Sequence, residues 1–348
     1  MTIRFGIISG VHYHVHFWAE AIIDSPDAEL VGIWDKDPVV GQAFAEKFNT
    51  RYWDDFDALL NACDAVGIAG ETGNHVHWVE RAASAGKSIL LEKAMARNVA
   101  ECDRIVRAVQ DAGVVFMQNF PKRYDPINHE LVQLVQSGEL GAISAVRIRH
   151  CNDHLLRMLE PDSTEHRWFL DPELAGGGAL IDEGVHAIDM MLWLLGDPVE
   201  VTASISNRTL DLEVEDTAFA LFKFGTGTIA EIYASNMMLA AEESVEVYGT
   251  KGTAILSGVD LASKSLTRQP YLKIYRDGEN KEAWQGPDTV PYFQHTTHFH
   301  QQGPLLFLEC IKSGKQPVVN LADGRKSVIL AEAAYQAARS GQAQKISY

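Results

Sequence analysis

The stretch that decides the fold is residues 176–196, which read GGGALIDEGVHAIDMMLWLLG. Three consecutive glycines interrupt any regular element, and their backbone can approach a ligand closely. The residues after them predict a helix, because apolar side chains recur at steps of four and three and form one buried stripe: Ile181, Val185, Ile188, Leu192 and Leu195. Gly196 and Pro198 end this helix.

A polar face accompanies the apolar stripe. Asp182, His186 and Asp189 are spaced i, i+4 and i+7, which places them on one side of the helix and within mutual reach. An imidazole between carboxylates on a rigid helix is a suitable general base near neutral pH. The alternative is that His186 only packs at the polar edge of the helix.

Composition limits the classes of protein that this chain can be. Its 348 residues, 46% of them hydrophobic, suffice for two domains with sizeable cores. A net charge of −17 argues against non-specific binding to nucleic acid or an anionic membrane. The four cysteines form no CxxC pair, and the sequence shows neither a signal peptide nor about 18 uninterrupted apolar residues. We therefore expect a cytoplasmic protein.

The first third of the chain alternates strand and helix. Short apolar runs are separated by helical patterns, as in a doubly wound parallel sheet of the Rossmann type. The predicted strands are 3–8, 29–34, 65–69, 88–91 and 114–117, with helices around 75–85 and at 99–112 among their connections.

The pattern changes after Pro121 and predicts an α+β domain on an open, mostly antiparallel sheet. Its strands are expected at 144–148, 199–206, 217–224, 228–234, 244–248, 253–257 and 272–275, and its other helices at 127–137, 303–313 and 325–340. We place the domains at 1–122 and 123–348, with the last helix free to pack back on the first domain. Loops 151–170 and 276–300 are expected to carry substrate specificity.

The turn after the first strand is where a Rossmann fold binds the pyrophosphate of a dinucleotide. It reads Ser9-Gly10-Val11-His12, with one glycine where G-x-G-x-x-G has three. Asp35 ends the second strand, 25 positions after Gly10, near the spacing at which a carboxylate binds the ribose hydroxyls. A carboxylate at Asp35 favours NAD, and the neighbouring Lys36 leaves NADP as an alternative cofactor. Taken alone, Asp35 is explained equally well as part of an ordinary turn at the end of a strand.

Two groups of histidines suggest metal binding as an alternative. His12, His14 and His16 follow the first strand, as in metal-dependent amidohydrolase barrels, and a second group contains His295, His298 and His300. Such a barrel needs eight strand–helix units, whereas this chain has about five before its antiparallel sheet. We therefore predict no metal site.

Lys93 follows the buried run 88–91, at the strand end where parallel sheets bind ligands. Partial desolvation there is expected to lower the pKa of this lysine and let it polarise a substrate hydroxyl. The alternative is a surface Glu92–Lys93 pair.

These pieces together resemble the Gfo/Idh/MocA oxidoreductases (glucose–fructose oxidoreductase, inositol dehydrogenase) over essentially the whole chain. The matching stretches are AGKSILLEK at 85–93, RYDP at 123–126, GELG at 138–141, GGGALIDEGVHAID at 176–189 and SGKQP at 313–317. The resemblance implies a Rossmann domain, a second α+β domain, a pocket between them and a homo-oligomer formed through the second sheet.

The resemblance also implies roles for single residues. Lys93, Asp182 and His186 would be catalytic. The cofactor contacts would be Ser9, Gly10, Val11, His12, Asp35, Lys36, His75, Glu92 and Lys93, and the substrate contacts Arg123, Tyr124, Arg167, Trp168, Asp182 and His186. Ala94 departs from the family, which usually has a proline at this position, often in a cis bond. A cis bond before alanine is several kcal/mol less accessible, so the placement of Lys93 is the feature that this departure affects.

The expected function is an NAD(P)-dependent dehydrogenase that acts on a sugar, cyclitol or similar polyol. His186 would take the hydroxyl proton while Lys93 stabilises the developing alkoxide. Two other functions stay open: an NAD-dependent glycosidase that uses transient oxidation, and a non-catalytic sugar or nucleotide sensor on the same fold.

Overall fold

The computed structural model describes residues 2–160, 167–238, 244–257, 272–276 and 299–348. The first domain is a five-stranded parallel sheet in the order β2-β1-β3-β4-β5, which confirms the predicted Rossmann sheet. Its strands are β1 (Ile3–Ile8), β2 (Ala28–Trp34), β3 (Ala65–Ile68), β4 (Ser88–Glu92) and β5 (Phe116–Asn119).

Helices cover both faces of this sheet. They are α1 (His14–Asp24), α2 (Pro38–Lys47), α3 (Phe56–Ala62), α4 (His75–Ser84) and α5 (Val99–Ala112), with the short turn η1 (Thr72–Asn74). Side chains of β1 on opposite faces of the sheet pack in two different hydrophobic cores. Phe5 belongs to the core that contains Trp18, and Ile8 belongs to the core that contains Leu59. Apart from the exposed Arg4, β1 is buried on both faces, which is why the sequence shows it as an almost continuous apolar run.

The start of α1 differs from those of α2, α3 and α5. Asp37, Asp55 and Asn98 accept backbone hydrogen bonds at the starts of α2, α3 and α5. Tyr13 precedes α1 and makes no side-chain capping bond. The donors at this helix end therefore depend on the turn before it.

The second domain is built on an eight-stranded sheet in the order β12-β11-β10-β6-β9-β8-β7-β13. Its neighbouring strands are antiparallel except for the pair β6–β9, so the prediction of a mostly antiparallel sheet is confirmed. The strands are β6 (Ile143–Cys151), β7 (Glu200–Ser206), β8 (Thr217–Lys223), β9 (Ile229–Ser235), β10 (Ser244–Gly249), β11 (Gly252–Ser257), β12 (Leu272–Arg276) and β13 (Gln344–Lys345).

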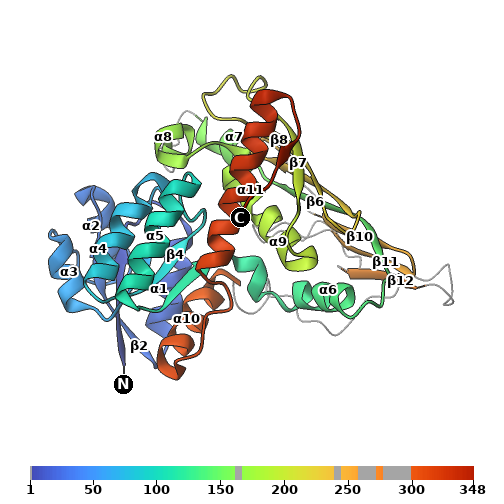
Figure 1. Ribbon diagram of the computed structural model, residues 1–348. Coiled ribbons are helices and arrows are strands. Elements are labelled where there is room, and N and C mark those ends of the chain that lie inside the picture. The colour runs from blue at the N-terminus through green and yellow to red at the C-terminus, as the bar shows by residue number, and fades with distance from the viewer. Residues whose placement is uncertain (1, 161–166, 239–243, 258–271, 277–298) are drawn as a thin grey trace.

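The remaining helices follow β5 in the chain. They are α6 (Pro126–Gln136), α7 (His154–Met158), α8 (Pro172–Ala175), α9 (Val185–Leu195), α10 (Gln302–Ser313) and α11 (Leu321–Ser340), with the short helices η2 (Pro121–Tyr124), η3 (Arg167–Leu170), η4 (Leu180–Gly184) and η6 (Phe299–Gln301). Helix α11 runs between the two domains (Figure 1) and contacts α5 and β5 on one side and α9 and β7 on the other. Helix α10 packs against α1 and so returns to the first domain, before α11 and β13 lead back to the second sheet.

One face of the second sheet lies against helices and the other carries exposed apolar side chains. In β8, Ala218, Ala220 and Phe222 are buried, whereas Phe219 and Leu221 between them are exposed. This alternation follows from the period of two along a strand. No helix within the described ranges combines the length and the apolar character needed to cross a membrane.

Candidate active site

Lys93 joins the two domains. It follows the carboxyl end of β4, and its Nζ lies 2.5 Å from Oδ1 of Asp182 and 3.2 Å from the backbone oxygen of Asp182. Both side chains are buried. The peptide bond between Lys93 and Ala94 is cis, contrary to what alanine predicts. The structure thus brings together two residues that are 89 positions apart in the sequence.

A π-helical turn presents Asp182. Residues Leu180–Gly184 form this turn, and α9 begins directly after it. The wider turn replaces the plain helix that we predicted from residue 181, and π-turns are frequent at functional sites. The second carboxylate oxygen of Asp182 accepts a hydrogen bond from the side chain of Asn236, which follows β9. Asn236 was missed because one asparagine after a strand carries no spacing signal.

The charges of this ion pair differ from our prediction. Burial lowers the pKa of Lys93, but the carboxylates of Asp182, Glu183 and Glu92 outweigh it and leave the pKa above its ordinary value. Burial raises the pKa of Asp182, and Lys93 brings it below its ordinary value. The lowered lysine pKa that we expected is therefore wrong, because three carboxylates surround the ammonium group.

His186 is buried in α9 beside this pair. Its ring meets those of Phe120 and His150 edge to face, with centroids 6.1 and 5.0 Å away. Burial is the main cause that lowers its pKa well below 6.5, and the ammonium group of Lys93 lowers it further. The ring is therefore neutral near pH 7. Its Nδ1 is buried without a hydrogen-bond partner among the described residues.

The carboxylates of the helix do not flank His186 in the way that we predicted. Asp182 pairs with Lys93, and Asp189 pairs with Arg123. Glu183 is the carboxylate that groups with the ring: one ligating atom each from His150, Glu183 and His186 lie within 4.8 Å of one another. The π-turn changes the angular spacing of these residues, so a plain helical wheel mispredicts their partners.

The three glycines serve protein packing. A Cβ atom at Gly178 would lie 1.9 Å from the backbone oxygen of Glu215, and one at Gly177 would lie 2.2 Å from the hydroxyl of Tyr335. Glu215 accepts hydrogen bonds from the backbone N–H of Gly178 and of Leu180. The close approach that we predicted for a ligand is therefore made by Glu215 and Tyr335.

Arg123 and Tyr124 make internal contacts. The guanidinium group of Arg123 donates two hydrogen bonds to Asp189, at 2.9 and 2.7 Å, and the Tyr124 hydroxyl lies 3.4 Å from the backbone oxygen of Gln118. Arg167 is exposed on η3, and Trp168 stacks on Phe169. Substrate contacts by Arg123, Tyr124, Arg167 and Trp168 stay predictions.

The backbone N–H groups of the turn between β1 and α1 donate to acceptors within the protein. These backbone N–H groups have protein acceptors: Ser9 (Trp34 oxygen, 2.8 Å), Gly10 (Asp35 Oδ2, 2.7 Å), Val11 (Ser9 Oγ, 3.4 Å), His12 (Ala69 oxygen, 3.3 Å) and His14 (His12 Nδ1, 3.2 Å). A dinucleotide's pyrophosphate is normally held by such donors. In this conformation these donors are engaged within the protein, so a pyrophosphate bound here would have to replace some of these acceptors.

Other predicted cofactor contacts are also engaged within the protein. Asp35 is buried and also accepts hydrogen bonds from the Ser9 hydroxyl and the Asp37 N–H. Lys36 pairs with Glu71 at 2.7 Å. The ring of His75 is fully buried, and its nitrogens contact the backbone oxygens of Ala94, Met95 and Gly70. A cofactor contact by His75 stays a prediction, and in this structure its ring supports the loop after Lys93.

A second group that can hold a metal lies at the same edge of the sheet. One ligating atom each from His12, His14 and Glu92 lie within 4.8 Å of one another, and all three residues are buried. Burial raises the pKa of Glu92 to about 7. The predicted cofactor residues His12 and Glu92 are thus brought together. His295 and His298 lie outside the described residues.

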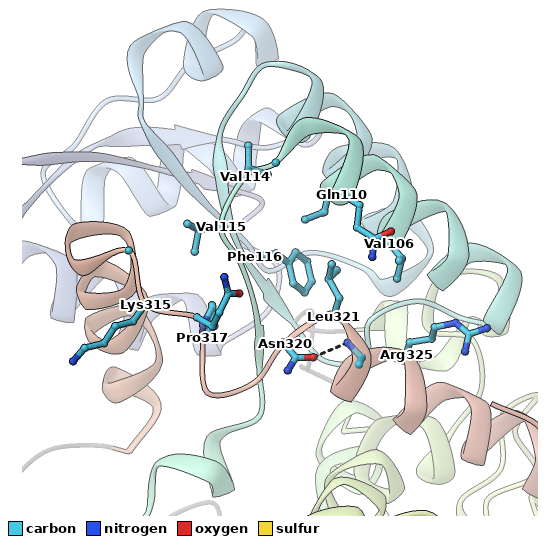
Figure 2. Close-up of a pocket in the computed structure, with 15 residues that line it drawn as sticks. Val106, Gln110, Val114, Val115, Phe116, Lys315, Pro317, Asn320, Leu321 and Arg325 are labelled. Atoms are coloured by element: carbon cyan, nitrogen blue, oxygen red, sulfur yellow. Dashed lines mark hydrogen bonds between the residues drawn. The ribbon is translucent and has the colours of Figure 1, made fainter.

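A pocket of about 440 Å³ lies elsewhere (Figure 2), between the end of α5, the start of β5 and the start of α11. Val114, Val115 and Phe116 line it at the amino end of β5, whereas Lys93 follows the carboxyl end of the neighbouring parallel strand. It is therefore separate from the candidate site.

Family models match both domains. Residues 3–120 match "Oxidoreductase family, NAD-binding Rossmann fold", and residues 129–255 match "GFO/IDH/MocA C-terminal domain". The recognition of the family from its motifs, and of NAD as its cofactor, is thereby confirmed.

Curated relatives and solved structures extend these matches. The chain is 24% identical to myo-inositol 2-dehydrogenase of Thermotoga maritima over 81% of this chain and 80% of the relative. It is 26% identical to 1,5-anhydro-D-fructose reductase of Ensifer adhaerens over 99% and 98% of the two chains. The structure of aldose-aldose oxidoreductase from Caulobacter crescentus with glycerol superposes with a TM-score of 0.82 at 26% identity, covering 99% of this chain and 100% of that one. Levoglucosan dehydrogenase with NADH and levoglucosan shares the fold, with a TM-score of 0.85 at 20% identity and full coverage of both chains.

Proposed function

This chain belongs to the GFO/IDH/MocA oxidoreductases and has their NAD-binding Rossmann domain, and we propose that it transfers a hydride between a nicotinamide and a hydroxyl or keto carbon of a sugar, cyclitol or related polyol. Curated relatives named for inositol and for 1,5-anhydro-D-fructose support this substrate class. NAD supplies the hydride acceptor when it is bound.

The observation that carries the proposal is the contact of Lys93 with Asp182 beside a neutral imidazole. The lysine comes from the first domain, and the carboxylate and His186 come from the second. The ammonium group of Lys93 is close enough to lower the pKa of His186. A cation, an anion and a neutral base are thus held together by rigid elements of both domains.

Each of these residues has a separate task. In the oxidation direction, the neutral ring of His186 accepts the proton of the substrate hydroxyl. The ammonium group of Lys93 has three donors, of which Asp182 occupies two, so one donor remains for the oxygen that becomes negative. Asp182, held by Asn236, fixes the position of the ammonium group.

The test measures NADH formation with a panel of polyols and sugars. His186→Ala and Lys93→Met should each lower kcat at least about 100-fold, because a positioned proton acceptor or charge contributes that much or more. Lys87→Met is the matched control, since Lys87 lies before the amino end of β4 and its Nζ contacts the backbone oxygen of Cys63. Wild-type rates in either active-site variant contradict the assignment.

The same assay separates the two catalytic functions. A dehydrogenase accumulates NADH in proportion to product, whereas a glycosidase that oxidises transiently recycles it. Formation of product without accumulation of NADH would therefore contradict the dehydrogenase and support the glycosidase. Absence of product with every substrate that shifts the melting temperature would favour a sensor.

We also propose that the exposed face of the second sheet is covered by a second copy of the chain. Phe219 and Leu221 on β8 and Ile229 on β9 are each more than two-fifths exposed, and Phe219 stacks on Tyr233 with ring centroids 4.2 Å apart. Phe219, Leu221 and Tyr233 are neighbours on this face, and adjacent exposed apolar side chains are typical of an interface. Sedimentation equilibrium of the full chain measures its oligomeric state.

A further inference from the structure

We propose that His12, His14 and Glu92 form a binding site for a divalent transition metal ion, a function that is separate from the proposed hydride transfer. Each residue offers one ligating atom, and these atoms lie within 4.8 Å of one another. Nδ1 of His14 lies 3.1 Å from Oε2 of Glu92, a separation that two ligands of one ion have in tetrahedral coordination. The residues come from the β1–α1 turn and the end of β4, so two different elements converge.

The site is enclosed and its carboxylate is oriented. His12, His14 and Glu92 are at most 2% exposed. The Asn119 side chain donates to Oε2 of Glu92 at 2.8 Å, and the backbone N–H of Lys93 donates to Oε1 at 2.9 Å. Hydrogen bonds of this kind orient the ligands of a metal ion.

Aromatic rings surround the imidazoles. The His300 ring lies beside that of His14, with centroids 3.8 Å apart. Phe169 and Trp168 lie near His12, at 5.8 and 6.3 Å between centroids. Such a shell limits the access of water to the ion and holds the imidazole rings in place.

The sequence of the turn fits this use. Counted from the end of β1, the residues SGVHYH place Ser9, Val11 and His14 where a dinucleotide fold has its three glycines. The first glycine position requires a tight turn, and Ser9 adopts it with φ of +70°. Imidazole thus stands at the third glycine position, where the helix and strand approach each other. The turn therefore carries imidazole side chains beside the backbone that the fold uses for the dinucleotide.

The ligand types select the metal. Two imidazoles and one carboxylate suit Zn²⁺, Fe²⁺, Co²⁺ or Ni²⁺, whereas Mg²⁺ and Ca²⁺ prefer ligand sets made of oxygen. Three protein ligands leave at least one position for water or for an oxygen of a small molecule. The four cysteines are not among the ligands.

The experiment measures metal binding directly. The purified full chain is stripped with a chelator, loaded with Zn²⁺ or Co²⁺ and desalted, and its metal content, Zn²⁺ affinity and Co²⁺ absorption spectrum are recorded. The wild type should retain about one equivalent per chain. His14→Ala and the isosteric Glu92→Gln should weaken affinity at least about tenfold, and Asn119→Ala about 10- to 100-fold.

His16→Ala is the matched control. His16 belongs to the same histidine run, but its ring packs against Phe44 and Phe48, with centroids 5.7 and 5.6 Å away. This variant should bind Zn²⁺ like the wild type. Melting temperatures establish that each variant is folded.

Three results overturn the proposal. They are a wild type that retains no ion, a His14→Ala or Glu92→Gln chain that binds Zn²⁺ as tightly as the wild type, and an ion that survives both substitutions but is lost in His150→Ala. The last result would place the ion in the group of His150, Glu183 and His186. NADH formation is followed in the same samples, so failure of the metal site and failure of the dehydrogenase are seen separately.

Discussion

Replacing Asp189 by asparagine should destabilise the protein strongly. Asp189 is 1% exposed and Arg123 8% exposed, and two hydrogen bonds of 2.9 and 2.7 Å join them. The pair connects η2, which follows the first domain, to α9 of the second. Asparagine has a similar shape but no charge, so the substitution leaves the guanidinium group buried without its main partner.

The geometry sets the size of the effect. Breaking a buried ion pair by removing one partner costs about 3 to 5 kcal/mol. Asp323 lies 3.5 Å from the same guanidinium group and compensates part of the loss, so we expect the lower end, about 3 kcal/mol. A chain of 348 residues unfolds with an entropy of roughly 0.7 kcal/mol/K, which converts this loss to about 4 °C in Tm.

Urea denaturation and thermal unfolding of four proteins test this reasoning: the wild type, Asp189→Leu, Arg123→Met and the double variant. The double variant removes both charges and should recover most of the stability that either single variant loses. Asp189→Asn is measured beside them. Losses below about 1 kcal/mol in the single variants, or a double variant whose loss equals the sum of the single losses, would refute the argument.

Three further predictions concern pH and assembly. Burial raises the pKa of Asp125 to about 6, against about 4 in an unfolded chain. The buried carboxylate therefore lowers the free energy of unfolding fully above about pH 6 and not at all below about pH 4. Asp125→Asn should therefore raise Tm by a few degrees at pH 8, with up to about 3 kcal/mol gained, and change it little at pH 4; an equal shift at both pH values contradicts this. Because burial keeps the pKa of His186 well below 6.5, kcat/KM for oxidation should stay constant from about pH 8 to below about 6.5, whereas a decline centred near 6.5 would show an ordinary histidine. Phe219→Glu with Leu221→Glu should dissociate the oligomer in sedimentation equilibrium without lowering Tm by more than a few degrees, and an unchanged mass would remove this face as the interface.

The order of strands and helices could be predicted from local patterns. The strand β1 is covered on both faces from Phe5 onward and has no polar side chain there. The period of two in β8 indicates one covered and one exposed face. The helix α3 was missed because its seven residues are too short for a clear period of 3.6. The motifs at 85–93 and 176–189 singled out Lys93, Asp182 and His186 as candidates before their contacts were known.

The partners of these residues depend on contacts between segments that are distant in sequence. Asn236 reaches Asp182, and Glu215 fills the space beside Gly178. Nothing local to these residues indicates either contact. The π-turn at Leu180–Gly184 also changes which carboxylates lie beside His186, because it is wider than a turn of a plain helix.

The amino-acid sequence alone established the elements, the family and the three candidate catalytic residues, because periodicity and motif spacing are properties of neighbouring positions. Only the tertiary structure decided which charges meet. It placed three carboxylates around Lys93 and let Asp35 accept a hydrogen bond from the β1–α1 turn. It also brought Glu92 close to His12 and His14. Burial and Coulomb interactions depend on distance in space, which the order of residues along the chain does not specify.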